Sequence, residues 1–168
     1  MLKELFPDVK QVGLLYCSAE ANSQYQIQLC EAALDKDGIA YKEYAIADTN
    51  EVQSVTTAAA GECDVLYIPT DNTLASVTET VYNVVAPAKV PVIAGEEGIC
   101  NGCGVATLSI SYYDLGYATG EMAYEILAEG ADITTMDVRY APNVTKKYNA
   151  KICEELGITV PDDYVAIQ

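Results

Sequence analysis

Short apolar runs rich in β-branched residues alternate along this chain with segments in which apolar residues recur every three or four positions. The runs are typical of buried strands, and the second spacing is typical of helices with one apolar face. Their alternation predicts βαβ units, and therefore an α/β domain with a mostly parallel sheet. The predicted strands are residues 12–16, 40–45, 65–69, 90–94, 105–110 and 136–140, and the predicted helices are 22–37, 51–60, 73–86, 114–129 and 145–156.

Two of these helices carry the clearest apolar stripes, each on one face of the helix. The stripe residues are Leu74, Val77, Val81 and Val84 in the first helix, and Leu115, Ala118, Met122 and Ile126 in the second. Between the two helices, residues 98–104 hold three of the eleven glycines and change the character of the chain. That stretch predicts a hinge or a tight hairpin loop.

Composition narrows the class of partner. The chain has 168 residues, of which 51% are hydrophobic, so it is long enough to bury a substantial core. The net charge of −16 disfavours nucleic acid and anionic lipid surfaces. No apolar run approaches the roughly 20 residues that a transmembrane helix needs. The start, MLKELFPDVK, lacks the basic and apolar regions of a signal peptide.

The six cysteines leave the redox compartment open. Cys17, Cys30, Cys63 and Cys153 lie singly in apolar segments, where a small buried thiol is ordinary. Cys100 and Cys103 form a CxxC pair, for which structural thiols, a local disulfide and a redox function all remain open. The chain has no His and no second CxxC, so a closed zinc site is not expected.

Polar residues follow the predicted strands, where the ligands of open parallel sheets bind. These segments read CSAEANS, TDN, GEEG and SYYDLG. One interpretation is helix capping, by Asn22 or Ser23 at one helix and by Asn72 or Thr73 at another. Capping does not account for four carboxylates predicted at the same edge, namely Glu20, Asp71, Glu96 and Glu97.

These carboxylates suit an ammonium group, and the N–H groups at helix starts suit a carboxylate, so the edge suits an amino acid zwitterion. Tyr112 and Tyr113 are candidates for an aromatic wall. The alternative is that Glu96 and Glu97 are solvated loop charges and Tyr112 is core. Catalysis finds no comparable support, because His is absent and no GxSxG, GxxxxGKS or GxGxxG motif occurs. The expectation is a binding protein without enzyme activity, cofactor or metal.

Five segments in order resemble the solute-binding proteins of ABC transporters linked to tryptophan and tyrosine uptake. They read VGLLYCSAEANS, YIPTDNTLASV, VPVIAGEEG, GVATLSISYYDLGYATGEMAYEIL and KKYNAKICEELGITVP, and the resemblance as a whole extends from about residue 8 to about residue 161. The resemblance implies a type I periplasmic binding protein fold, a Rossmann-like three-layer αβα arrangement with two domains that close on a ligand.

Only the second half of such a protein is represented. The resemblance implies that residues 8–97 and 136–161 form the second domain. Residues 104–131 would supply a strand and a helix to the missing first domain, across a hinge at residues 98–104. The apolar stripe of helix 114–129 would then lack its usual partner, and we expect it to be covered by exchange between two copies or by packing elsewhere on the same copy.

The resemblance also implies a ligand site. Its candidate residues are Ser18, Glu20, Asn22, Ser23, Thr70, Asp71, Asn72, Glu96, Glu97, Tyr112 and Asp114. The sequence departs from the family pattern at Ser111, where relatives usually have Asp, at Ser109, where Gly is common, and in the CNGC segment.

The implied function is delivery of a small solute, such as an aromatic amino acid, to a membrane permease. The implied location is extracytoplasmic, either periplasmic or as a lipoprotein on the outer face of a Gram-positive membrane. The alternatives are a ligand-sensing regulatory domain of the same fold and, with less support, a redox protein acting through Cys100 and Cys103.

Overall fold

A computed structural model describes residues 1–141 and 143–167. The chain divides into two compact units. The first unit contains residues 1–108 and 146–168, and the second contains residues 109–145. Among the described residues, no helix combines the length and the apolar character needed to cross a membrane.

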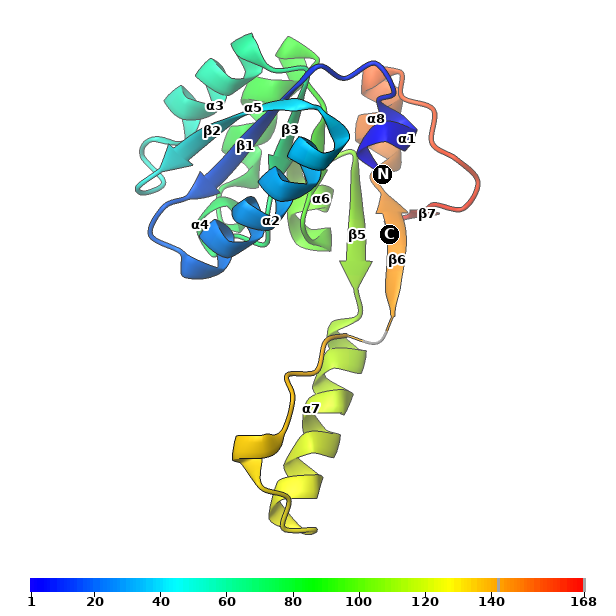
Figure 1. The fold of residues 1–168 in the computed structure, drawn as a ribbon. Helices are drawn as coiled ribbons and strands as arrows, with labels where there is room; N and C mark the ends of the chain where they lie inside the picture. Colours follow the sequence, from blue (N-terminus) through cyan, green and yellow to red (C-terminus); the bar gives the residue numbers. More distant parts are fainter. Residues whose placement is uncertain (142, 168) are drawn as a thin grey trace. The chain divides into compact units, whose positions relative to one another are not determined.

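The sheet has seven strands in the order β2-β1-β3-β4-β5-β6-β7 (Figure 1). The strands are β1 (Gln11–Cys17), β2 (Ala40–Ile46), β3 (Val65–Ile68), β4 (Val92–Ala94), β5 (Ala106–Ile110), β6 (Val144–Tyr148) and β7 (Val165–Ala166). The pairs β1–β2, β1–β3, β3–β4, β4–β5 and β6–β7 are parallel. The prediction of an α/β fold with a mostly parallel sheet is therefore confirmed.

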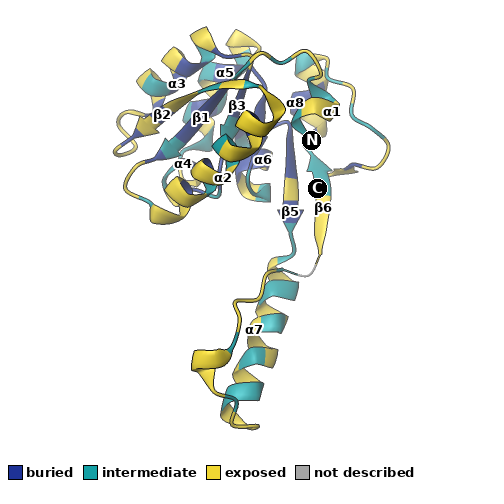
Figure 2. Ribbon diagram, in the orientation of Figure 1, coloured by how far each residue is buried: buried dark blue, intermediate teal, exposed yellow. Residues whose placement is uncertain are grey.

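Helices cover both faces of the sheet in the first unit, because each inner strand is apolar on both sides. The helices of this unit are α1 (Leu2–Leu5), α2 (Ala21–Asp37), α3 (Val52–Glu62), α4 (Asn72–Ala75), α5 (Thr78–Ala88), α6 (Glu97–Cys103) and α8 (Ala150–Leu156). Val12 and Leu14 of β1 pack with Ile27 of α2 on one face. Leu15 and Cys17 belong to the larger core on the opposite face, which α3, α5 and α6 complete (Figure 2).

The predicted helix 73–86 is two helices, α4 and α5, separated at Ser76 and Val77. Leu74 and Val81 are fully buried in the same core, so the apolar stripe identified a buried surface but not the break within it. The backbone of Val77 leaves the helical region, with φ −136° and ψ 31°. The recurrence of apolar residues every three or four positions does not reveal a break of this kind in the backbone.

The Gly-rich segment is not a loop, because residues 97–103 form the helix α6 within the first unit. Ile99, Cys100 and Cys103 face the core. A Cβ at Gly102 would lie 2.2 Å from the Thr78 hydroxyl oxygen, so the glycine permits close packing of α6 against the start of α5. The prediction of a tight hairpin loop at 98–104 is therefore wrong, and the hinge at this segment stays a prediction.

The predicted strand 136–140 and the predicted helix start at 145 are also wrong. Residues 136–140 form no strand, and Val138 and Tyr140 are 79% and 82% exposed. The strand is β6, and α8 begins only after Asn149, whose side chain accepts a hydrogen bond from the Ile152 N–H. Lys147 of β6 pairs with Val165 of β7; most of β6 lies within the predicted helix, and β7 lies outside all the predicted elements.

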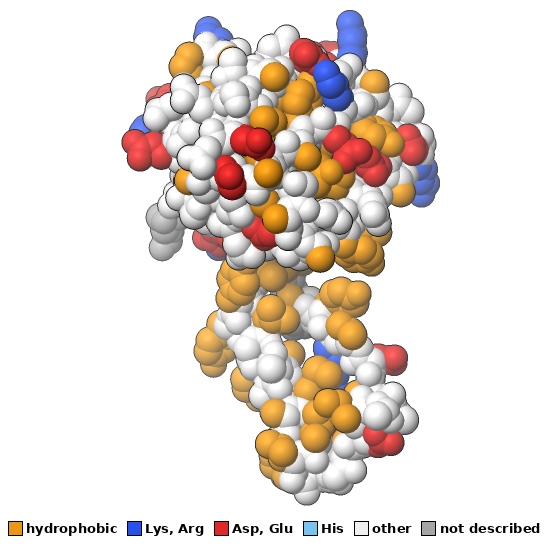
Figure 3. All heavy atoms as spheres, turned by 90° about the vertical axis from the view of Figure 1, so that its left-hand side faces the viewer, with side chains coloured by type: hydrophobic (Ala, Val, Ile, Leu, Met, Phe, Trp, Pro, Cys, Tyr) orange, Lys and Arg blue, Asp and Glu red, His pale blue; other side chains and the backbone are white. Residues whose placement is uncertain are grey.

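The second unit consists of α7 (Tyr112–Leu127), the 3₁₀ helix η1 (Ile133–Thr135) and the segments around them. No residue of α7 is buried. The predicted stripe, with Leu115 and Met122 among its members, is half-buried, whereas Tyr113 and Leu127 are 80% and 86% exposed. Hydrophobic side chains, tyrosines included, are prominent on this unit in the space-filling view (Figure 3).

Candidate functional site

The loops that follow β1 and β3 meet at the carboxyl edge of the sheet, where Asp71 joins them. Its carboxylate accepts hydrogen bonds from the Cys17 N–H (2.7 Å), the Ser23 hydroxyl (2.8 Å) and the Leu74 N–H (2.8 Å). Asp71 is 1% exposed and Ser23 is fully buried. Asp71 thus caps α4 and ties it to β1 and α2, and its side chain does not reach the solvent.

Glu20 fastens the same two loops from the outside. Its carboxylate accepts bonds from the N–H and side-chain amide of Asn72 (3.0 and 2.9 Å) and from the N–H and hydroxyl of Thr73 (2.8 and 2.7 Å). Partial burial alone would raise the pKa of Glu20, but these hydrogen bonds stabilise the ionised form and lower the pKa to about 2. Glu20 is therefore an anion that the start of α4 already holds.

Thr70 is held through its backbone. Its carbonyl accepts a bond from the Asn22 side-chain amide (2.9 Å), and its N–H donates to the Gln26 side chain (3.0 Å). The Ser18 hydroxyl lies at the same edge and donates to the Ile46 carbonyl (3.0 Å). Gln26 was not among the candidate residues, because its position one turn inside α2 gives no sign in the sequence that it reaches the next loop.

The loop after β4 carries Glu96 and Glu97. Glu96 caps α6 by accepting bonds from the Gly98 N–H (2.8 Å) and the Ile99 N–H. Glu97 forms a 2.6 Å ion pair with Lys147 of β6. A Cβ at the preceding Gly95 would lie 2.6 Å from the Thr70 nitrogen, so this glycine allows the β3 and β4 loops to lie against each other.

The predicted caps are therefore wrong in their identity. The capping carboxylates belong to Asp71, Glu20 and Glu96, not to Asn22, Ser23, Asn72 or Thr73. At α4 and α6 a carboxylate takes the capping position, because a negative charge interacts favourably with the partial positive charge at a helix start, whereas the start of α2 has no side-chain cap. The N–H groups expected to receive a ligand carboxylate at α4 and α6 are consequently engaged by the protein itself.

Tyr112, Tyr113 and Asp114 lie in the first turn of α7, in the second unit. Tyr112 is 59% exposed, so the interpretation of Tyr112 as a core residue is wrong. Ser111 caps this helix by accepting a bond from the Asp114 N–H at 3.1 Å.

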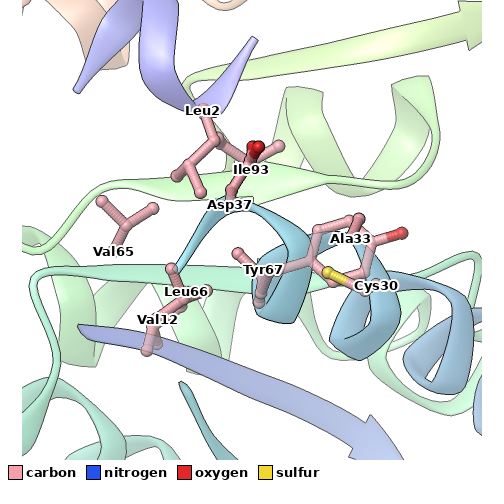
Figure 4. A pocket seen from close by; sticks show the side chains of 10 residues that line it. Leu2, Val12, Cys30, Ala33, Asp37, Val65, Leu66, Tyr67 and Ile93 are labelled. Atoms are coloured by element: carbon pink, nitrogen blue, oxygen red, sulfur yellow. The ribbon is translucent and has the colours of Figure 1, made fainter. Parts of the chain in front are cut away.

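An apolar cavity of about 230 Å³ lies elsewhere in the first unit, between α2 and the face of the sheet (Figure 4). Cys30, Ala33 and Leu34 line it from α2, and Leu2 of α1 lines it from another side. Its strand residues, such as Val65 of β3, precede the carboxyl edge, and its walls are almost entirely apolar. The cavity is distinct from the cluster of polar loops at the carboxyl edge. The polar loops fit the chemistry of an amino acid better than the apolar cavity does.

Cys100 and Cys103 are buried in α6 and are free thiols. Burial, the main cause, raises the pKa of Cys103 to about 12 and raises that of Cys100 as well. A redox cysteine needs a low pKa and access to its substrate, so the structure supports the interpretation of these residues as structural thiols.

Comparison with known proteins identifies relatives along the whole chain. The family model for the ABC transporter substrate binding protein matches residues 1–167. A tyrosine-binding protein of Clostridioides difficile (strain R20291) is 35% identical over 142 residues, covering 82% of this chain and 41% of its own length.

Two solved structures agree closely with the fold. An ABC domain from Streptococcus pneumonia in complex with L-Trp has a TM-score of 0.86 and 35% identity, covering 96% of this chain and 54% of that one. The ligand-free, open structure of a substrate binding protein with adhesive properties from Clostridium difficile has a TM-score of 0.81 and 34% identity. The match covers 99% of this chain and 57% of that one. The chain thus spans about half the length of the relatives it matches.

Proposed function

This chain belongs to the ABC transporter substrate-binding protein family, and we propose that it carries one half of a binding site for an aromatic amino acid. In this proposal the ligand lies at the carboxyl edge of the sheet, against the loops after β1, β3 and β4. The candidate contacts are Ser18, Glu20, Asn22, Thr70, Asn72 and Glu96. Asp71 and Ser23 support the site from below, since both are buried.

The observation that carries the proposal is the rigid connection of these loops at one edge. Glu20, Asp71 and Gln26 join segments that are more than 40 residues apart in sequence. Such a network holds polar groups in place before the ligand arrives, which reduces the entropy that binding costs. Ligands of open α/β sheets bind at this edge, and two relatives are described by their binding of tyrosine and of L-Trp.

The proposal includes the partners of the intact protein. The solute would be released to an ABC permease, the location would be extracytoplasmic, and the chain would bind without catalysing a reaction. A domain corresponding to the remaining half of the relatives would close over the edge, with Tyr112 and Asp114 near the crossing between the two domains.

We further propose that α7 belongs structurally with that other domain. A helix of 16 residues with no buried side chain has little to hold it in isolation. In this chain alone, exchange of the second unit between two copies would cover it. Light scattering that reports a strict monomer, together with rapid amide exchange throughout α7, would rule out the exchange.

The test of the proposed function is calorimetric titration of the chain with each of the twenty amino acids. We expect weak but measurable binding of L-tryptophan and L-tyrosine, because this chain spans about half the length of its relatives, and no heat with L-alanine or L-glutamate. Equal heats for all twenty, or none with any aromatic amino acid, would contradict the proposal.

A further inference from the structure

The apolar cavity between α2 and the sheet has no part in the proposed function. Buried strand residues, among them Val65 of β3 and Ile93 of β4, line it on the side of the sheet. Leu34 of α2 and Leu2 of α1 line it from the helices (Figure 4). Protein interiors are close-packed, so an apolar cavity of about 230 Å³ is an unusual feature of the first unit.

The walls of this cavity present no unpaired charge to a ligand. Of the described residues that line it, Asp37 alone is charged. The Asp37 carboxylate forms a 3.1 Å ion pair with Lys3 of α1, and both side chains are exposed. An ionised group of a ligand would lose its hydration against apolar walls without gaining a partner, which is costly. The net charge of −16 further disfavours an anion such as a fatty acid.

Two neutral polar side chains also line the cavity, Tyr67 of β3 and Cys30 of α2. The Tyr67 ring extends from the strand toward Cys30 and Ala33 (Figure 4). Burial, the main cause, raises the pKa of Tyr67 to about 12 and that of Cys30 to about 11, so both groups are uncharged at neutral pH. No other described residue forms a hydrogen bond with the Tyr67 hydroxyl, which can therefore donate to a ligand or accept from it.

The volume of the cavity limits the size of its ligand. An apolar cavity of about 150 Å³ in another protein binds benzene. The cavity of about 230 Å³ in this chain leaves room for a second fused ring. Pockets for drug-sized ligands start at about 300 Å³, so a larger molecule would not be enclosed.

We infer that this cavity binds a small uncharged aromatic molecule of one or two fused rings, with the Tyr67 hydroxyl as its polar contact. The site is separate from the carboxyl edge, and the inference goes beyond the proposed function. A free amino acid suits this site poorly, because its ammonium and carboxylate groups would lie against apolar walls. The cavity and the carboxyl edge therefore select ligands of opposite character.

Indole and L-tryptophan separate the two sites, since they share a ring system but only the amino acid is charged. In amide NMR titrations of the chain, we expect indole to shift the resonances of residues 30–34 and 65–67 saturably. L-tryptophan at the same concentrations should leave these resonances unchanged. Shifts with indole that do not saturate, or equal shifts with both compounds at these residues, overturn the inference.

A pair of variants on α2 tests the location. Ala33→Trp attaches a ring at the cavity and should weaken indole binding by about tenfold or more, because the tethered ring competes at a high effective concentration. Ala32→Trp makes the same change at the neighbouring exposed position, which does not line the cavity, and should change the dissociation constant less than about twofold. Equal effects in the two variants overturn the assignment to the cavity.

A third variant tests the polar contact and does not depend on the fold of Ala33→Trp. Indene has the same two fused rings as indole but lacks the N–H group. Tyr67→Phe should weaken the binding of indole by about two- to tenfold, as the loss of one neutral hydrogen bond predicts, and should leave the binding of indene unchanged. An equal change for both ligands, or none for indole, overturns the role of Tyr67.

Discussion

Replacement of Asp71 by alanine tests whether this residue supports the edge or contacts the ligand. The change leaves the N–H groups of Cys17 and Leu74 and the hydroxyl of Ser23 without their acceptor, all in a buried site. A buried donor without a partner costs about 1 to 3 kcal/mol. The Ser23 hydroxyl can rotate toward another acceptor, whereas the two backbone N–H groups cannot.

The expected loss is therefore about 3 to 5 kcal/mol in the free energy of unfolding, a large share of a typical domain's stability. In thermal unfolding the midpoint should fall by on the order of 10 °C. Urea denaturation followed by circular dichroism measures the free energy directly.

Asp48→Ala is the matched control. Asp48 also accepts a backbone hydrogen bond, from the Asn50 N–H at 2.8 Å, but in an exposed turn. Water replaces that acceptor, so the loss should stay below about 1 kcal/mol. If Asp71→Ala destabilises the chain no more than Asp48→Ala does, the assignment of Asp71 as a buried support is refuted.

Three further predictions follow from the same contacts. The pKa of Glu20 is lowered from 4.5 to about 2 in the folded chain, so the contribution of Glu20 to stability is present above pH 4.5 and is lost as the pH falls toward 2. The difference in unfolding free energy between the wild type and Glu20→Gln should therefore shrink as the pH falls over that range. A difference that stays constant would contradict the prediction. Gly95→Ala should destabilise the fold by about 1 to 3 kcal/mol, because the added Cβ would clash with the backbone of the β3 loop. Gly61→Ala should stabilise the fold by about 0.5 to 1 kcal/mol, because Gly61 lies in α3 with open space around it. Thermal unfolding that ranks the two variants in the reverse order would refute this prediction. In the native chain at pH 7.5, a maleimide should modify the partly exposed Cys30 before the buried Cys103, and mass spectrometry that finds Cys103 modified first would restore the redox interpretation.

The alternation of strands and helices from β1 to β4 was predictable because burial on both faces leaves continuous apolar runs. β1 shows this plainly, with Val12 and Leu14 packing on one face and Leu15 and Cys17 on the other. The same logic failed for VTKKY, where Lys146 and Lys147 form ion pairs with acidic residues. A strand stabilised by such pairs and by its neighbours has no apolar run to reveal it.

The meeting of the polar loops at one edge was also predictable, since the carboxyl ends of parallel strands lie at the same edge of the sheet. The roles of its residues were not. Glu20 reaches Asn72 across 52 positions of sequence, and Lys147 reaches Glu97 across 50. Local sequence patterns favour short side chains such as Asn72 as helix caps. When the fold brings a carboxylate from a distant loop close to the helix start, that carboxylate accepts the hydrogen bonds of the same N–H groups instead.

The most direct test of the account is to locate L-tryptophan on this chain by amide NMR mapping. We predict that the shifts concentrate in the three loops of the carboxyl edge, residues 18–23, 70–73 and 95–99. Shifts concentrated instead around Cys30 and Tyr67, which line the apolar cavity, or along residues 62–64 at the opposite edge of the sheet, would contradict it.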